Sequence, residues 1–171
     1  MRSTAFAFAA FVLMLSSACT PKIVKVDMDT ARLATIGATD TRLRCGYRLG
    51  DVVDMRPSGD RAGGLGIRMF AFEDAPGVIR SSLSNVGFLE DAVSRRVEVR
   101  LMRLYMNQVN VTKIPVVVYE VHVDGQAPAL IRSQLPNMNW NGSENEAYRG
   151  YGRALEGANR QLVETLNLAC G

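Results

Sequence analysis

The sequence predicts an α+β fold, with a mixed or antiparallel sheet of about four to five strands and two helices packed on one face of it. Several segments alternate apolar with polar residues, which is the two-residue period of a half-buried strand. Two other segments, 75–86 and 143–166, place apolar residues at helical spacing. The elements follow in the order strand, loop, helix, three strands, helix, which favours helices gathered on one side of a sheet.

The first core strand is predicted over 43–55, where apolar residues occupy alternate positions from Leu43 to Leu49. Shorter strands are expected at 23–26 and 65–72. After the first core strand, the segment Gly59–Gly66 contains neither of the phosphate-binding motifs GxGxxG and GxxxxGK[ST]. We interpret this stretch as a loop rather than a phosphate cradle.

The first helix is predicted over 75–86, because Asp74 can cap it, Pro76 suits its first turn and Gly87 can end it. Residues 97–106 alternate but change phase near Leu101, which predicts a strand with a bulge.

The most regular strand is 117–123, and the turn Asp124-Gly125 leads from it into a partner strand at 129–135. A capping box at Ser143–Glu146 opens the last helix. We expect Gly150 and Gly157 to let this helix lie close to the sheet. Its apolar stripe comprises Ala147, Tyr151, Leu155, Ala158, Leu162 and Leu166.

Residues 1–18 have the three parts of a secretory signal peptide: a charged start at Arg2, an apolar run from Ala5 to Leu15 and small residues before Cys19. A helix that crosses a bilayer needs about 20 apolar residues, and this run is much shorter. We therefore expect export, with cleavage just before Cys19, into an oxidising envelope compartment.

Leu15-Ser-Ser-Ala-Cys19 resembles a bacterial lipobox, in which the cysteine is diacylated and becomes the mature N-terminus. The family pattern has Leu where this chain has Ser16, and an ordinary signal peptidase would cut at the same bond. Lipidation of Cys19 explains the odd number of cysteines, because it leaves an even pair. The resemblance implies a membrane anchor, and Thr20 in place of Asp implies the outer membrane, facing the periplasm. A soluble periplasmic or secreted protein is the alternative.

These signals divide the chain into a signal peptide (1–18), a lipidated N-terminus with a tether (19–41) and a single α+β domain (42–171). Cys45 and Cys170 remain as the even pair, and an oxidising compartment favours a disulfide over two free thiols.

Composition excludes some partners. The net charge is only +3, and basic residues are spread along the chain without a block, so no nucleic-acid footprint is present. Of the 20 basic residues, 17 are arginines, which fits either anion recognition or arginine-rich codon usage. We expect no cofactor.

The strongest catalytic candidate is the face Glu120, His122 and Asp124, because alternate strand residues project to the same side. His122 is the only histidine and no CxxC or GxSxG is present, so we expect no metal and no catalytic residue. The alternative interpretation is an exported enzyme or small-ligand-binding protein that uses this face.

A polar loop carries the only tryptophan, Trp140, between Asn139 and Asn141. An exposed Trp140 would be a possible anchor for partner binding, whereas a buried one would fix the start of the last helix.

The strand end Val52-Val-Asp-Met-Arg-Pro57, followed by a glycine-rich loop, resembles the corresponding segment of YajG-like envelope lipoproteins. The helix ending at Gly87-Phe88, the later hairpin and the long last helix match that layout. LptE-like and PqiC-like lipoproteins have similar layouts. The resemblance implies a non-enzymatic envelope lipoprotein that binds a protein or lipid partner, as an accessory of an assembly or transport system.

Overall fold

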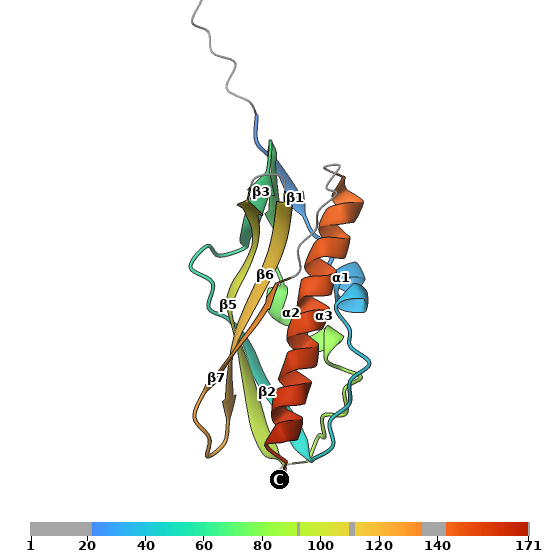
Figure 1. Ribbon diagram of the computed structural model, residues 1–171, viewed down its shortest axis with the longest axis vertical. Helices are drawn as coiled ribbons and strands as arrows, with labels where there is room; N and C mark the ends of the chain where they lie inside the picture. Colours follow the sequence, from blue (N-terminus) through green and yellow to red (C-terminus); the bar gives the residue numbers. More distant parts are fainter. Residues whose placement is uncertain (1–21, 92, 110–111, 135–142, 171) are drawn as a thin grey trace, which may run out of the picture.

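The computed structural model describes residues 22–91, 93–109, 112–134 and 143–170, and these ranges hold seven strands and three helices. The fold is α+β, as the sequence predicts, but the strands form two mixed sheets rather than one (Figure 1). The strands are β1 (Val24–Asp27), β2 (Tyr47–Asp54), β3 (Arg61–Leu65), β4 (Arg68–Ala71), β5 (Arg95–Val109), β6 (Thr112–Val123) and β7 (Ala129–Gln134). The helices are α1 (Thr30–Ile36), α2 (Ala75–Ser82) and α3 (Glu144–Leu168).

The larger sheet has the strand order β2-β5-β6-β7. β5, β6 and β7 form an antiparallel meander, whereas β2 lies parallel to β5 because the chain passes through β3, β4 and α2 between them. The predicted bulge is confirmed, since the β5–β6 register shifts between Leu101 and Arg103. One face of this sheet is buried, including Val99 on β5 and Tyr119 and Val121 on β6.

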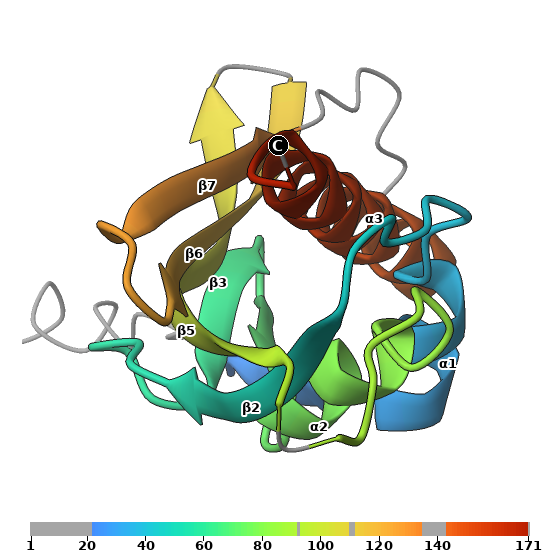
Figure 2. The ribbon, with the colours of Figure 1, turned by 90° about the horizontal axis from the view of Figure 1, so that it is seen from below.

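The two predicted helices, α2 and α3, pack against the larger sheet, α2 at β2 and α3 at β6 and β7. α3 packs along β6 and β7 (Figure 1), and α1 contacts both α3 and α2. Seen from below, the curved sheet and the helices surround a common core (Figure 2). Every residue of the predicted apolar stripe of α3 is buried. The Ser143 side chain accepts a hydrogen bond from the Glu146 N–H, which confirms the predicted cap. Among the described helices, none combines the length and the apolar character that crossing a membrane requires.

The smaller sheet, in the order β1-β4-β3, corrects the interpretation of Gly59–Gly66 as a loop. Most of this segment belongs to β3, which pairs antiparallel with β4. Gly63 has a φ of 88°, and a Cβ there would lie 3.0 Å from the Met106 backbone nitrogen of β5. The glycine thus allows β3 to pass close to the larger sheet, a role that a composition rule for loops does not detect.

The segment before β2 contains two elements, β1 and α1. β1 lies at its predicted place, but α1 was not predicted. The Leu33 side chain of α1 is completely buried, and the backbone at Gly37 accepts a hydrogen bond from the Asn159 amide of α3. α1 has only seven residues, too few for a clear helical period.

Glycines set the distance between α3 and its neighbours, as predicted for Gly157. A Cβ at Gly157 would lie 2.5 Å from the Ser133 Oγ of β7. Gly152, which was not singled out, has the same role toward α1, because a Cβ there would clash with Ile36. Small residues therefore allow α3 to contact the sheet on one side and α1 on another.

Candidate functional site

A disulfide joins Cys45, just before β2, to Cys170, just after α3. Their Cα atoms are 5.9 Å apart, a normal distance for a disulfide. Next to it, the Tyr47 hydroxyl donates to the Leu166 carbonyl over 3.0 Å. The pairing expected from the cysteine count is therefore compatible with the fold.

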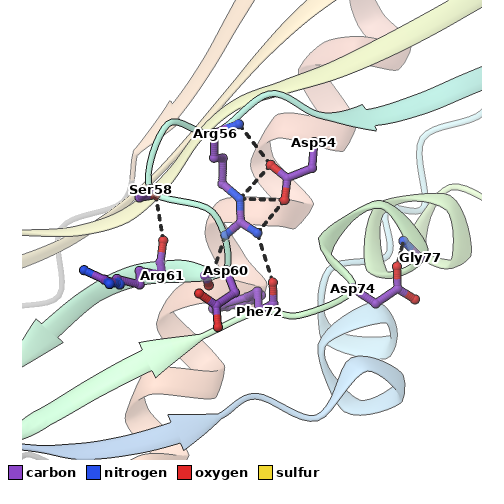
Figure 3. A network of polar contacts seen from close by, with 8 residues as sticks. All are labelled: Asp54, Arg56, Ser58, Asp60, Arg61, Phe72, Asp74 and Gly77. Atoms are coloured by element: carbon purple, nitrogen blue, oxygen red, sulfur yellow. Dashed lines mark hydrogen bonds and ion pairs between the residues drawn. The ribbon is translucent and has the colours of Figure 1, made fainter.

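The end of β2 carries a buried ion pair between Asp54 and Arg56 (Figure 3). The Arg56 side chain is only 1% exposed. Its Nε donates to both Asp54 carboxylate oxygens, over 2.9 and 3.0 Å, and its Nη2 donates to Oδ2 over 2.6 Å. Such a bidentate contact is among the stronger polar contacts in proteins.

The same guanidinium joins three segments. Its Nη2 donates to the Phe72 carbonyl over 2.9 Å and its Nη1 to the Asp60 carbonyl over 3.4 Å. Figure 3 shows these bonds connecting the end of β2 to the chain before β3 and after β4, close to the Asp74 cap of α2. Every nitrogen of the guanidinium thus donates to the protein itself, so we assign Arg56 a structural role.

The outer face of the larger sheet carries alternating charges. Glu120 accepts a hydrogen bond from His122 Nε2 over 2.6 Å and pairs with Arg100 over 3.3 Å. The hydrogen bond from His122 is the main reason why the pKa of Glu120 is lowered, and the nearby Arg100 lowers it further. Arg96 also pairs with Glu98 over 3.2 Å. The acids and bases of this face neutralise one another.

Asp124 does not join this cluster. Its carboxylate accepts the backbone N–H of Arg96 over 3.0 Å, which fixes the end of the β5–β6 pair. In the part of the chain that the structure describes, no three His, Cys, Asp or Glu side chains are placed to hold a metal ion. Of the three candidate residues, Glu120 and His122 therefore belong to a row of ion pairs on the outer face of the sheet. Asp124 instead contacts the backbone.

A cavity of about 460 Å³ lies between β2, α2 and the segment 88–90. Its apolar lining comes from Leu49, Leu83, Phe88 and Leu89, its basic lining from Arg48 and Arg80, and the rest from Ser84 and Glu90. No motif in the sequence indicates this site. Alternation places Arg48 opposite the buried face of β2, but no pattern relates it to Arg80, which lies 32 positions later on a helix.

Several predicted residues lie outside the described ranges. They are the lipidation candidate Cys19 and the partner-binding candidates Asn139, Trp140 and Asn141.

No protein-family model matches the sequence, and no curated protein is significantly similar to it. Among solved structures, the chain is similar to protein XCC0632 from Xanthomonas campestris, described with the family DUF330. The TM-score is 0.50 at 8% identity, over 84% of this chain and 95% of that one. An uncharacterized protein matches with a TM-score of 0.42 at 11% identity, over 78% of this chain and 99% of that one. At such low identity the similarity to XCC0632 concerns the fold alone. This chain therefore shares its fold with a protein described with the family DUF330.

Proposed function

We propose that this chain is a non-enzymatic, lipid-anchored protein of the bacterial envelope, which binds a protein or lipid partner as an accessory of an assembly or transport system. YajG-like, LptE-like and PqiC-like lipoproteins are the families whose layout it resembles. The outer membrane, facing the periplasm, is the proposed location.

The arrangement of the cysteines carries this proposal. The chain has three cysteines, and two of them, Cys45 and Cys170, are joined in the structure. Cys19 then has no cysteine left to pair with inside the chain, and it stands directly after the signal-peptide pattern. Disulfides are typical of exported proteins, and acylation accounts for the remaining thiol.

A binding role fits the surface better than catalysis does. The acids and the histidine on the outer face of the sheet already have partners, and Asp124 holds a backbone amide. The cavity beside β2 instead presents arginines and apolar side chains, which are the groups that hold a ligand in place.

Replacing Cys19 with Ala tests the anchor. The variant should still be exported and cleaved, but it should move from the membrane fraction to the soluble periplasmic fraction. Thr20→Ala is the matched control and should stay in the membrane fraction. A Cys19→Ala variant that remains as membrane-bound as the wild type would contradict the proposal.

A further inference from the structure

We propose that the cavity between β2, α2 and the segment 88–90 binds a small anionic amphiphile, with a phosphate or carboxylate head attached to a short apolar chain. This inference rests on the binding role proposed above and deepens it by naming the ligand class. Ligand pockets in proteins have volumes of about 300–1,000 Å³. The volume of about 460 Å³ falls within that range.

The charge of the ligand follows from the two arginines. Arg80 Nη2 donates to the Gly50 carbonyl over 3.0 Å, and Arg48 Nε donates to the Ser94 carbonyl over 3.3 Å. These single bonds to neutral acceptors hold each side chain while leaving other N–H groups of the guanidinium available. Within the described residues, neither arginine has a carboxylate at ion-pair distance. A pair of planar guanidinium groups is well suited to bind a phosphate or carboxylate.

Two acidic residues, Glu90 and Asp91, lie near the two arginines, but neither forms an ion pair with them in the part of the chain that the structure describes. Glu90 also lines the cavity. Asp91 lies close enough to Arg48 for that arginine to contribute to the lowered pKa of its carboxyl group, but the hydrogen bonds from Ser94 are the main cause. The Asp91 carboxylate accepts the Ser94 N–H over 2.7 Å and is therefore already engaged. We expect Glu90 to weaken anion binding, and this gives a test of opposite sign.

The apolar part of the ligand follows from the walls. Leu83 is completely buried, and Leu49 and Phe88 pack against the core, so core packing holds these walls in place. Leu89 is 46% exposed although its backbone N–H is fixed on the Tyr47 carbonyl over 2.8 Å. An apolar side chain held in solvent beside two arginines offers a surface for a hydrocarbon chain next to the site of the headgroup.

Isothermal titration of the purified full chain with decyl phosphate, below its critical micelle concentration, tests the proposal. We expect one molecule to bind per chain. Decyl maltoside, which shares the tail, and inorganic phosphate, which shares the head, should each bind at least about tenfold more weakly. Competition by phosphatidylglycerol vesicles would identify a membrane lipid as the source of the headgroup. No competition would identify a soluble amphiphile.

Variants separate the charge contributions. Arg80→Gln and Arg48→Gln should each weaken decyl phosphate binding about tenfold, whereas Glu90→Gln should strengthen it. Arg153→Gln, at an exposed arginine of α3 outside the cavity, is the matched control and should change nothing. If Arg48→Gln does not fold, the variants Arg80→Gln and Glu90→Gln still test the proposal, because the Arg80 side chain is exposed and its replacement should not affect folding.

Equal binding of decyl maltoside, an unchanged affinity of Arg80→Gln, or no binding of decyl phosphate would each overturn the proposed ligand class. The titration is made on purified protein, so it can fail while the Cys19 fractionation succeeds. The two proposals are therefore tested separately.

Discussion

Replacing Arg56 with Met should destabilise the fold more than replacing any exposed arginine. Met keeps much of the length of the side chain but removes all its donors. The change would leave the Asp54 carboxylate without its bidentate partner and would remove the donors to the Phe72 and Asp60 carbonyls. It would also disconnect the end of β2 from the chain beside β3 and β4.

The magnitude follows from the burial of the pair. Removing one partner of a buried ion pair typically costs about 3–5 kcal/mol, because the other charge stays behind unpaired. The Asp54 side chain is 25% exposed, so water can solvate part of its charge after the substitution. We therefore expect a loss near the lower limit, about 3 kcal/mol. For a domain of this size that corresponds to a decrease in Tm of roughly 6–12 °C.

Equilibrium urea unfolding followed by circular dichroism measures this loss as a lower midpoint at an unchanged slope. Arg61→Met is the matched control, since Arg61 lies five positions later and is exposed, and it should change stability by at most about 0.5 kcal/mol. The double variant Asp54→Leu/Arg56→Met should recover much of the loss, because no unpaired charge remains. A loss below about 1 kcal/mol for Arg56→Met would refute the structural role of this pair.

Four further changes test the packing, the disulfide and the charged face. Gly152→Ala should lower the free energy of unfolding by about 1–3 kcal/mol, because the added methyl group meets Ile36, and Ile36→Ala should relieve much of this loss in urea unfolding of the double variant. Reducing the disulfide, which closes a loop with a sequence separation of 125, should lower the unfolding free energy by up to roughly 5 kcal/mol, and a melting temperature unaffected by reductant would argue against it. In the folded protein the pKa of Glu120 is below its ordinary value, so the ionised carboxylate stabilises the fold at any pH above that ordinary value. This stabilisation is lost as the pH falls through the lowered pKa. Glu120→Gln should therefore be less stable than the wild type near neutral pH and equally stable in acid, as urea unfolding at stepped pH would show. His122→Ala should leave the fold intact and, by NMR titration, raise the pKa of Glu120.

The parts of the fold that could be predicted are those in which burial determines a period in the sequence. β6 has one face against the helices, so Val117, Tyr119, Val121 and Val123 alternate with polar residues toward its end. α3 is long enough for its apolar stripe to recur over many turns. The caps of α2 and α3 were predictable because Asp74 and Ser143 bond to backbone N–H groups only three residues away.

The parts that could not be predicted depend on distant contacts. β3 contains two glycines, and its position is fixed by β4 and by the close approach of Gly63 to Met106. α1 is held by Leu33 in the core and by Asn159, which lies 122 positions away from the Gly37 carbonyl it contacts. Patterns among residues that are close in the sequence do not reveal such contacts.

The same limit applies to the candidate binding site, and the arginines show why. The most distinctive local motif, Asp54-Met-Arg56, turned out to be a clamp in which every nitrogen of the guanidinium donates to the protein. A similar strand end in another chain therefore indicates a shared fold rather than a shared ligand. Arg48 and Arg80 belong to no motif, but the parallel crossover through α2 brings them to one cavity, with N–H groups still available for an anion. Ligand recognition in this fold is therefore expected to depend on residues at the cavity, which can differ between chains that keep the clamp.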